Sequence, residues 1–444
     1  MTQDAPRKVV GVPRESFPGE RRAALVPAQV SVLTKAGFEV LIERAAGARA
    51  GYLDEEYAEH GAELVDTREG IFQRADIICQ VRTAGANRHA GADDFELLRD
   101  GQTLIGMCDP LGQPEIMQNL AGRGISIFAL ELLPRITRAQ SMDVLSSMAS
   151  VAGYKAVLTS ATLLPRMFPM MMTAAGTITP GRVFVLGAGV AGLQAIATAK
   201  RLGAVVWSYD IRPAVKEEVL SLGAKFLELD LVKTGEDKQS GGYAQQMDEE
   251  FYRKQREAMT KQIAESDVII TTAAVPGRKA PILVTEEMVK GMPPGSVIVD
   301  IAAEQGGNCE LTKANEVIVE HGVTIDGTIN LPATVPYHTS QMYAKNIVTF
   351  LLHLQKENAL DGESDDEIVQ DTLVTRGGDV VNARVREALG LTPPPAEETS
   401  SEATPPAGES PPVENAASES EAAAPPEAAT DSDSANKTAG QDTD

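Results

Sequence analysis

Residues 182–192 read RVFVLGAGVAG, and this stretch decides the fold of the chain around it. It predicts a β-strand, a Gly-x-Gly-x-x-Gly turn and a helix that continues to Leu202. A second strand follows at residues 204–210, AVVWSYD, and ends in Asp210. A strand, a glycine turn, a helix and a second strand with a terminal acid form the pattern of a dinucleotide-binding βαβ unit.

The three glycines of this turn have separate physical roles. Gly187 permits the tight turn, Gly189 lets the backbone approach a diphosphate, and Gly192 lets the helix pack close to the strand. The start of the helix offers N–H groups and a partial positive charge to phosphate oxygens. We therefore predict cofactor contacts from the three glycines and from Ala188 and Val190 between them.

Asp210 indicates which dinucleotide is bound. Its carboxylate can accept hydrogen bonds from both hydroxyls of the adenosine ribose, and its charge repels a 2′-phosphate, which favours NAD(H) over NADP(H). Arg212 works against this inference, because a nearby arginine can accommodate such a phosphate. We assign Ile211 and Arg212 to the same adenosine-binding segment.

Two later stretches extend the predicted site. Residues 267–274, DVIITTAA, read as a buried strand that ends in small residues. Ligands of such sheets bind at the carboxyl ends of the strands, so Ala274 is a predicted cofactor contact. A polar, glycine-rich stretch at residues 234–244 contains Gly242 and Tyr243. It is either a surface loop or a lid that carries Tyr243 over the cofactor and excludes water, and the sequence leaves both interpretations open.

Strand and helix patterns also alternate over residues 8–133, which predicts another parallel sheet covered on both faces. Long helical patterns at residues 141–162 and 337–355 suggest that the chain crosses out of this first domain and later returns. The predicted fold is therefore α/β, with two doubly wound, Rossmann-like parallel-sheet domains joined by long helices. The expected bounds are an N-terminal α/β domain at 1–140 completed by about 323–390, an NAD-binding domain at 141–322, and a disordered acidic tail rich in Pro, Ala and Ser at 391–444.

Composition excludes several classes of function. The net charge is −23, and residues 393–444 contain twelve acidic residues and one lysine. Because both the tail and the remaining body are acidic, binding to nucleic acid or anionic lipid is disfavoured. Cys79, Cys108 and Cys309 are scattered without metal-ligand spacing, so we expect no metal site and a reducing compartment. No stretch predicts a signal peptide or a transmembrane helix, so we expect no direct membrane insertion.

Four segments resemble the alanine dehydrogenase and transhydrogenase alpha-subunit superfamily. Residues 13–27 contain the pattern PRE followed by ERRAALVP, which is similar to the opening signature of this superfamily. Residues 135–146 (RITRAQSMDVLS), 241–244 (GGYA) and 299–308 (VDIAAEQGGN) resemble the transhydrogenase branch in particular. The resemblance covers about residues 8–385.

This resemblance implies a function and a set of partners. The chain would be the NAD(H)-binding subunit of a proton-translocating NAD(P) transhydrogenase, with the nucleotide in a cleft between two α/β domains and with a homodimeric assembly. Hydride would pass directly to or from NADP(H) on a separate beta subunit. Since the chain ends in the acidic tail, the membrane-spanning component would be a separate polypeptide. This subunit would then be cytoplasmic and peripheral on the inner face of the membrane.

The resemblance also implies residue roles. Arg135, Gln140, Asp143 and Ser146 match the family's nicotinamide contacts, and Tyr243 matches the tyrosine of its mobile loop. The first four of these side chains supply both donors and acceptors, as a carboxamide requires. The alternative is an ordinary helix N-terminus with Ser141 or Asp143 as its cap. Direct hydride transfer needs alignment and no protein acid or base, so we nominate no proton-transferring residue.

An alternative function in the same superfamily is an NAD-dependent alanine-type dehydrogenase. That reaction needs a proton-transferring group near the substrate. The family's histidine is missing from residues 104–111, LIGMCDPL, and Glu304 stands where those enzymes have an aspartate. Arg22 and Arg82 are able to hold a substrate carboxylate or to form salt bridges. A third possibility is a noncatalytic NAD-binding regulator.

Overall fold

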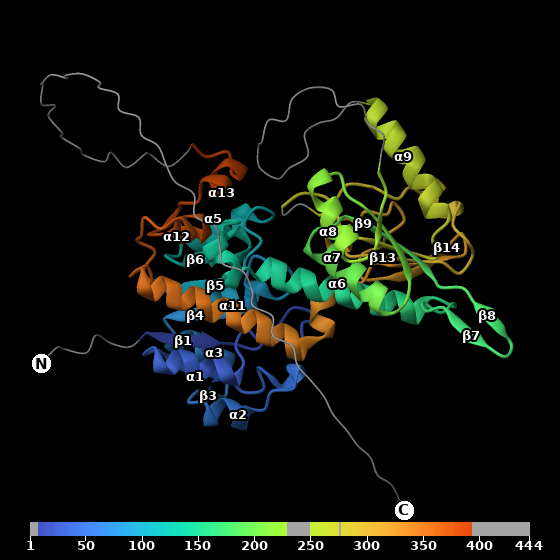
Figure 1. Cartoon of the computed structure of the whole chain (residues 1–444). Helices are drawn as coiled ribbons and strands as arrows, with labels where there is room; N and C mark the ends of the chain where they lie inside the picture. Colours follow the sequence, from blue (N-terminus) through green and yellow to red (C-terminus); the bar gives the residue numbers. More distant parts are fainter. Residues whose placement is uncertain (1–7, 229–248, 275–276, 393–444) are drawn as a thin grey trace, which may run out of the picture. The chain divides into compact units, whose positions relative to one another are not determined.

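Two mostly parallel β-sheets organise the chain over residues 8–228, 249–274 and 277–392, which this computed structural model describes (Figure 1). The first sheet has the strand order β17-β16-β6-β5-β4-β1-β2-β3, and the second has the order β11-β10-β9-β12-β13-β15-β14. Strands β16 and β17 of the first sheet and β14 of the second run antiparallel to their neighbours. The expected α/β, Rossmann-like fold class is confirmed.

The strands of the first sheet are β1 (Val9–Val12), β2 (Glu39–Glu43), β3 (Glu63–Val65), β4 (Ile77–Arg82), β5 (Thr103–Met107), β6 (Ser126–Ala129), β16 (Leu373–Arg376) and β17 (Asp379–Val380). Those of the second are β9 (Arg182–Leu186), β10 (Val205–Tyr209), β11 (Lys225–Phe226), β12 (Val268–Thr271), β13 (Val297–Asp300), β14 (Val317–Glu320) and β15 (Val323–Asp326). A separate hairpin consists of β7 (Met171–Thr173) and β8 (Gly176–Ile178).

Helices connect the strands of each sheet. In the part of the chain that forms the first sheet they are α1 (Pro27–Lys35), α2 (Asp54–Glu59), α3 (Arg68–Arg74), α4 (Gly91–Leu97), α5 (Pro114–Ala121), α11 (Pro336–Lys356), α12 (Glu367–Thr372) and α13 (Ala383–Ala388). In the part that forms the second sheet they are α6 (Val144–Leu163), α7 (Val190–Arg201), α8 (Lys216–Ser221), α9 (Glu249–Ala264) and α10 (Glu286–Lys290).

Strand β9 shows why its sequence is hydrophobic throughout. Val183 and Val185 belong to one buried cluster of the second sheet, whereas Phe184 and Leu186 belong to the other. Side chains alternate between the two faces of a strand, so a sheet covered on both faces requires apolar residues at every position. The glycine turn therefore begins directly where this rigid, fully buried strand ends.

Helix α6 links the two cores. Met148, near its start, is buried in the core of the first sheet, and Ala156, farther along, is buried in the core of the second. A β-carbon on Gly153 would lie 2.0 Å from the carbonyl oxygen of Ala191 in α7. Only a glycine permits this approach, which places α6 directly against the first turn of the helix that follows the glycine turn.

The structure differs from the sequence prediction at two boundaries. The helix predicted at 141–162 begins at Val144, because residues 137–142 form a separate 3₁₀ helix, η3 (Thr137–Met142). Strand β15 pairs with β13, so the second sheet continues past the expected boundary at residue 322 to Asp326. Over the described residues, no helix combines the length and hydrophobicity that crossing a membrane would take.

Candidate functional site

The glycine turn leaves the end of β9 with the geometry that its sequence predicts. Gly187 has a φ of +97°, in the region that favours glycine. A β-carbon on Gly192 would lie 1.9 Å from the carbonyl oxygen of Gly187, so the helix approaches the turn too closely for any side chain. At Gly189, by contrast, a β-carbon would meet one atom within 4 Å, Nη2 of Arg212 at 3.8 Å. The turn thus forms a backbone cradle that is open at its second glycine.

Helix α7 begins at this cradle. Gly189 is its N-cap residue, and no side chain caps the helix among the described residues. The first turn therefore presents its N–H groups and the positive end of the helix dipole at the cradle. Ala188 is buried, and Val190 is 44% exposed. This arrangement fits the diphosphate of a dinucleotide.

Asp210 follows β10 and faces the same turn. Its Oδ2 accepts a hydrogen bond from the backbone N–H of Ala188 at 2.7 Å. Its two oxygens also accept bonds from the backbone N–H and the guanidinium of Arg212. Burial acts to raise the pKa of Asp210, but the hydrogen bonds from Arg212 and Ala188 outweigh it and lower that pKa. The carboxylate is therefore ionised beside the cradle, and Ile211 is half-buried next to it.

The neighbouring strand β12 closes the other side of the turn. The hydroxyl of Thr272 donates to the carbonyl oxygen of Gly187 at 3.1 Å. Asn308 fixes the strand end through bonds with the backbone N–H and carbonyl of Ala273, at 3.0 and 2.8 Å. Ala274 is exposed one residue farther on. Thr272 and Asn308 were not predicted as site residues. Thr272 directly follows the buried strand β12, a signal that could have found it, whereas Asn308 lies in the loop after β13.

The buried carboxylate of Asp300 stabilises the carboxyl ends of β12 and β13. Asp300, at the end of β13, accepts hydrogen bonds from the backbone N–H groups of Asn308 and Cys309 and from the hydroxyl of Thr312. It also accepts from the hydroxyl of Thr271 in β12 at 2.8 Å. Asp300 therefore joins the two strand ends to the loop that holds Asn308.

The predicted nicotinamide contacts divide into two pairs. Arg135 and Gln140 are exposed, Gln140 within η3. Asp143 is the N-cap of α6, and its carboxylate accepts from the backbone N–H of Ser146 at 2.9 Å and from the hydroxyl of Ser146. Gln140 and Ser146 do not share one helical turn, since the 3₁₀ helix ends before Asp143 and α6 begins after it. The capping role, left open by the sequence, is present.

The two arginines that could have held a substrate carboxylate are both ion-paired. Arg22 is buried and donates through Nε and Nη2 to the two oxygens of Glu20, at 2.7 and 2.6 Å. Arg82 donates to the two oxygens of Glu304 at 2.6 and 3.0 Å. Both guanidinium groups therefore already have bidentate carboxylate partners within the chain.

Glu15 is buried together with Glu20 and Arg22, and its pKa provides a test of these buried charges. It accepts hydrogen bonds from the backbone N–H groups of Val81 and Arg82, at 2.6 and 3.2 Å. Burial, reinforced by the charge of Glu20, raises its pKa from 4.5 to about 8. A carboxyl group whose pKa is raised on folding stabilises the fold below its unfolded pKa, and this contribution is lost as the pH rises through the folded pKa.

Substituting Glu15→Gln is therefore expected to flatten the dependence of stability on pH. Between about pH 5 and pH 8 the unfolding free energy of the parent protein should fall relative to that of the variant, by up to about 1.4 kcal/mol per pH unit. Urea denaturation at a series of pH values measures this difference, in which groups common to both proteins cancel. Parallel curves for the two proteins would contradict the assignment.

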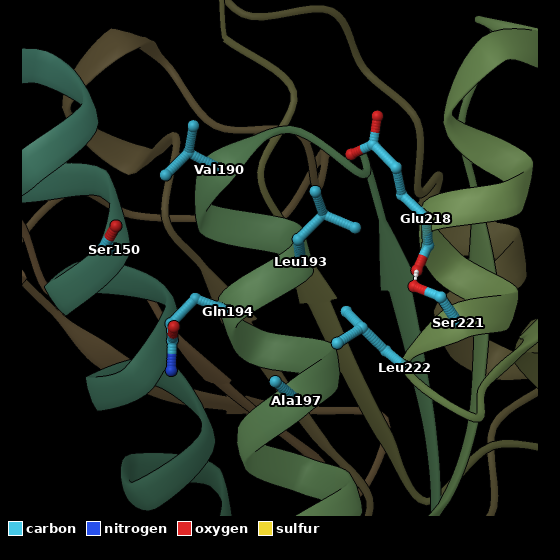
Figure 2. Close-up of a pocket in the computed structure, with 8 residues that line it drawn as sticks. All are labelled: Ser150, Val190, Leu193, Gln194, Ala197, Glu218, Ser221 and Leu222. Carbon is cyan, nitrogen blue, oxygen red and sulfur yellow. Dashed lines mark hydrogen bonds between the residues drawn. The ribbon is translucent and has the colours of Figure 1, made fainter. Parts of the chain in front are cut away.

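A separate cavity of about 410 Å³ lies beside α7 (Figure 2). Figure 2 shows Ser150 of α6 on one side and Glu218, Ser221 and Leu222 of α8 and the residue after it on the other. Val190 is the one predicted cofactor contact that lines this cavity. Over the described residues, no group of His, Cys, Asp and Glu side chains is arranged to hold a metal ion. Gly242, Tyr243 and residues 393–444 of the predicted tail lie outside the described residues.

Family models and known proteins match this chain over most of its length. Residues 11–152 match the family model for the N-terminal domain of alanine dehydrogenase/PNT, and residues 156–383 match that for its C-terminal domain. An NAD(P) transhydrogenase alpha-subunit protein of Rhodospirillum rubrum is 46% identical over 377 residues, which are 84% of this chain and 97% of that protein. The alanine dehydrogenase of Bacillus subtilis is 29% identical, over 90% of this chain and 100% of that protein.

Solved structures show the same order of similarity. A transhydrogenase structure from Sinorhizobium meliloti superposes with a TM-score of 0.75 at 44% identity, covering 84% of this chain and 100% of that chain. An L-alanine dehydrogenase structure superposes with a TM-score of 0.71 at 25% identity, covering 86% of this chain and 99% of that chain.

Proposed function

Because the chain belongs to the alanine dehydrogenase/PNT family, we propose that it is the NAD(H)-binding alpha subunit of a proton-translocating NAD(P) transhydrogenase. Its higher identity to transhydrogenase alpha subunits than to alanine dehydrogenase favours this branch. The observation that carries the NAD(H) assignment is the open cradle at Gly189 with the ionised Asp210 beside it. A diphosphate fits the cradle, and the carboxylate fits the hydroxyls of an adenosine ribose.

The proposed reaction is direct hydride transfer between NAD(H) on this subunit and NADP(H) on a beta subunit. A separate membrane-spanning subunit would couple this step to proton movement, and the chain would lie peripherally on the cytoplasmic face. Such a transfer depends on distance and alignment of the two nicotinamides, so the protein's task is positioning. The bidentate partners of Arg22 and Arg82 favour this reaction over amino-acid oxidation, which needs a free cation for the substrate carboxylate.

We propose that Arg135, Gln140, Asp143 and Ser146 position the nicotinamide. Arg135 and Gln140 are exposed and available to a ligand, whereas Asp143 and Ser146 fix the start of α6. Since α6 packs against the first turn of α7 through Gly153, the positioning segment is mechanically connected to the cradle. Tyr243 and Gly242 are proposed to close over the cofactor.

An assay with two arms tests this function. The purified chain is mixed with an NADP(H)-binding transhydrogenase component and an NAD analogue of distinct absorbance, and in the second arm it receives NAD with alanine. Turnover that requires the partner supports the proposal. Turnover with alanine alone would support the dehydrogenase alternative, and tight NADH binding without turnover in either arm would support a regulator.

Two arginines that are three residues apart provide a matched pair of variants. Arg135→Ala is expected to reduce transfer by at least about tenfold, because misalignment of reacting groups is costly. Arg138→Ala removes an equal charge three residues away, but Arg138 pairs with Asp366, so transfer should change little. Stopped-flow measurement of transfer at saturating NADH separates the two. Equal losses in both variants would contradict the role of Arg135.

We also propose a homodimer in which the β7–β8 hairpin is an interface. All six strand residues of the hairpin are exposed, and Met172 has 78% of its surface accessible. Residues 167–180 contain no charged side chain. An isolated two-stranded sheet is marginally stable in water, and an uncharged apolar surface of this kind is typical of an interface. A second copy of the chain is the simplest cover, because most soluble oligomers are symmetric dimers.

Met172→Asp is therefore expected to weaken dimerisation by at least about 100-fold, the effect of burying a charge at an interface centre. Sedimentation velocity over a concentration series measures the change. Leu53→Asp is the control, since Leu53 is 61% exposed but lies before α2, far from the hairpin in sequence. A dimer that survives Met172→Asp would remove the hairpin from the interface.

The two sheets support a division of the chain into two α/β domains. We propose an N-terminal α/β domain at about 1–140 completed by 323–390 and an NAD-binding domain at 141–322. Strands β16 and β17, which pair with β6 and with each other, support the return of the chain to the first sheet, and β15 moves the second boundary slightly later.

A further inference from the structure

Each oxygen of the Asp210 carboxylate accepts hydrogen bonds from two donors. Oδ2 accepts from the backbone N–H of Ala188 at 2.7 Å and from Nη2 of Arg212 at 2.9 Å. Oδ1 accepts from the backbone N–H of Arg212 at 2.8 Å and from its Nε at 3.0 Å. An ionised carboxylate offers about four lone-pair sites, so these donors saturate it.

The four donors differ in how easily they can leave. Two are backbone N–H groups whose positions are set by the glycine turn and by the end of β10. The other two belong to the guanidinium of Arg212, whose side chain is 46% exposed. A change of rotamer is enough to release the guanidinium, whereas release of the backbone donors requires the turn to move.

The guanidinium also borders the cradle. Its Nη2 is 3.8 Å from the point where a β-carbon on Gly189 would stand. Arg212 therefore covers the open edge of Asp210 and borders the second glycine at the same time. A ribose diol that binds the two oxygens of Asp210 from the open side needs the lone pairs that Nε and Nη2 now use.

We propose that Arg212 is a specificity-determining residue that competes with the adenosine ribose for Asp210. This inference rests on the proposed NAD(H) site. In competing, Arg212 weakens NAD(H) binding, because the ion pair must open before the ribose can be gripped. Once displaced, the guanidinium remains next to the ribose, where it can pair with a 2′-phosphate and offset the repulsion from Asp210. Asp210 makes the chain bind NADH more tightly than NADPH, and Arg212 therefore reduces this difference in affinity.

The test compares Arg212→Gln with the parent protein by calorimetric titration of NADH and of NADPH. Loss of a partly exposed ion pair corresponds to a change of about threefold to fivefold in affinity. NADH is expected to bind more tightly by this factor and NADPH more weakly by at least as much. Opposite shifts for the two nucleotides are a signature that a general loss of structure does not produce.

Lys216→Gln is the matched control. Lys216 lies four residues after Arg212, and its Nζ pairs with a carboxylate oxygen of Glu228 at 2.6 Å. Replacing it by glutamine removes the same charge as Arg212→Gln does. Both affinities should remain within about twofold of the parent values, because a partly exposed charge that is paired with Glu228 acts on the nucleotide only through a screened field. Arg212→Lys adds a second comparison: it retains the charge and loses the planar fork, so it should tighten NADH binding while it preserves NADPH binding.

The outcomes separate this inference from the function on which it rests. Weaker NADH binding by Arg212→Gln would mean that Arg212 holds the cofactor, and unchanged affinities would mean that it does not compete; either result overturns the proposal. If the parent chain binds neither nucleotide, the proposed NAD(H) site itself fails, and the competition fails with it.

Discussion

Gly192→Ala is expected to abolish measurable NADH binding and to destabilise the fold. The new methyl group would stand 1.9 Å from the carbonyl oxygen of Gly187 and 2.8 Å from its carbonyl carbon. Both are backbone atoms held between β9 and α7, so neither can rotate away as a flexible side chain would. The helix must therefore move off the strand, at a cost of about 2–4 kcal/mol in unfolding free energy. Urea denaturation and calorimetric titration of NADH measure the two effects.

Gly189→Ala is the matched control within the same turn. Its methyl group would meet a single atom, at 3.8 Å, so the fold should lose at most about 1 kcal/mol, the cost of alanine at an N-cap. NADH affinity should still fall by at least about tenfold, because the methyl group enters the space proposed for the diphosphate. Normal NADH binding by this variant would place the diphosphate elsewhere.

The second large effect is expected from Glu20→Ala. Glu20 and Arg22 are 1% and 2% exposed, and the carboxylate accepts two guanidinium bonds as well as one from Nδ2 of Asn330 at 2.9 Å. Removing one partner of a buried ion pair leaves an uncompensated charge, which costs about 3–5 kcal/mol. The midpoint of urea denaturation should fall accordingly, with an unchanged slope if unfolding remains two-state.

The pH dependence of stability tests the contribution of the Glu20–Arg22 ion pair. Burial acts to raise the pKa of Glu20, but the charge and hydrogen bonds of Arg22 outweigh it and lower that pKa to about 2. Its stabilisation is therefore present above pH 4.5 and is lost as the pH falls toward 2. Glu63→Ala, which breaks the exposed pair with Arg74, should have little effect at any pH. A similarly small effect of Glu20→Ala would contradict the importance of the buried pair.

The dinucleotide-binding unit could be predicted because all its parts are local. Gly187, Gly189 and Gly192 have roles that depend on the strand before them and the helix after them, both of which the hydrophobic pattern reveals. The structure places Asp210 directly at this turn through its bond to Ala188, as the spacing suggests. The fold class follows for a similar reason, since fully apolar strands alternating with helices require a covered parallel sheet.

Other features depend on residues that are distant in the chain. The partner of Arg82 is Glu304, and that of Thr272 is the carbonyl of Gly187. The sequence left Arg22 and Arg82 open between binding a substrate and forming salt bridges, because residue type sets charge but not the partner. The sequence also left the start of α6 open, because it depends on the capping bond of Asp143 rather than on hydrophobic periodicity.

Sequence alone therefore determined the strands, the glycine turn and the acid that follows it, since short-range sterics and side-chain alternation act within a few residues. Only the tertiary structure decided which charges are already paired, above all that the guanidinium of Arg212 rests on Asp210 and that Glu20 neutralises Arg22. Hydrogen bonds and ion pairs act over about 3 Å, and packing across the whole chain sets which groups come within that distance.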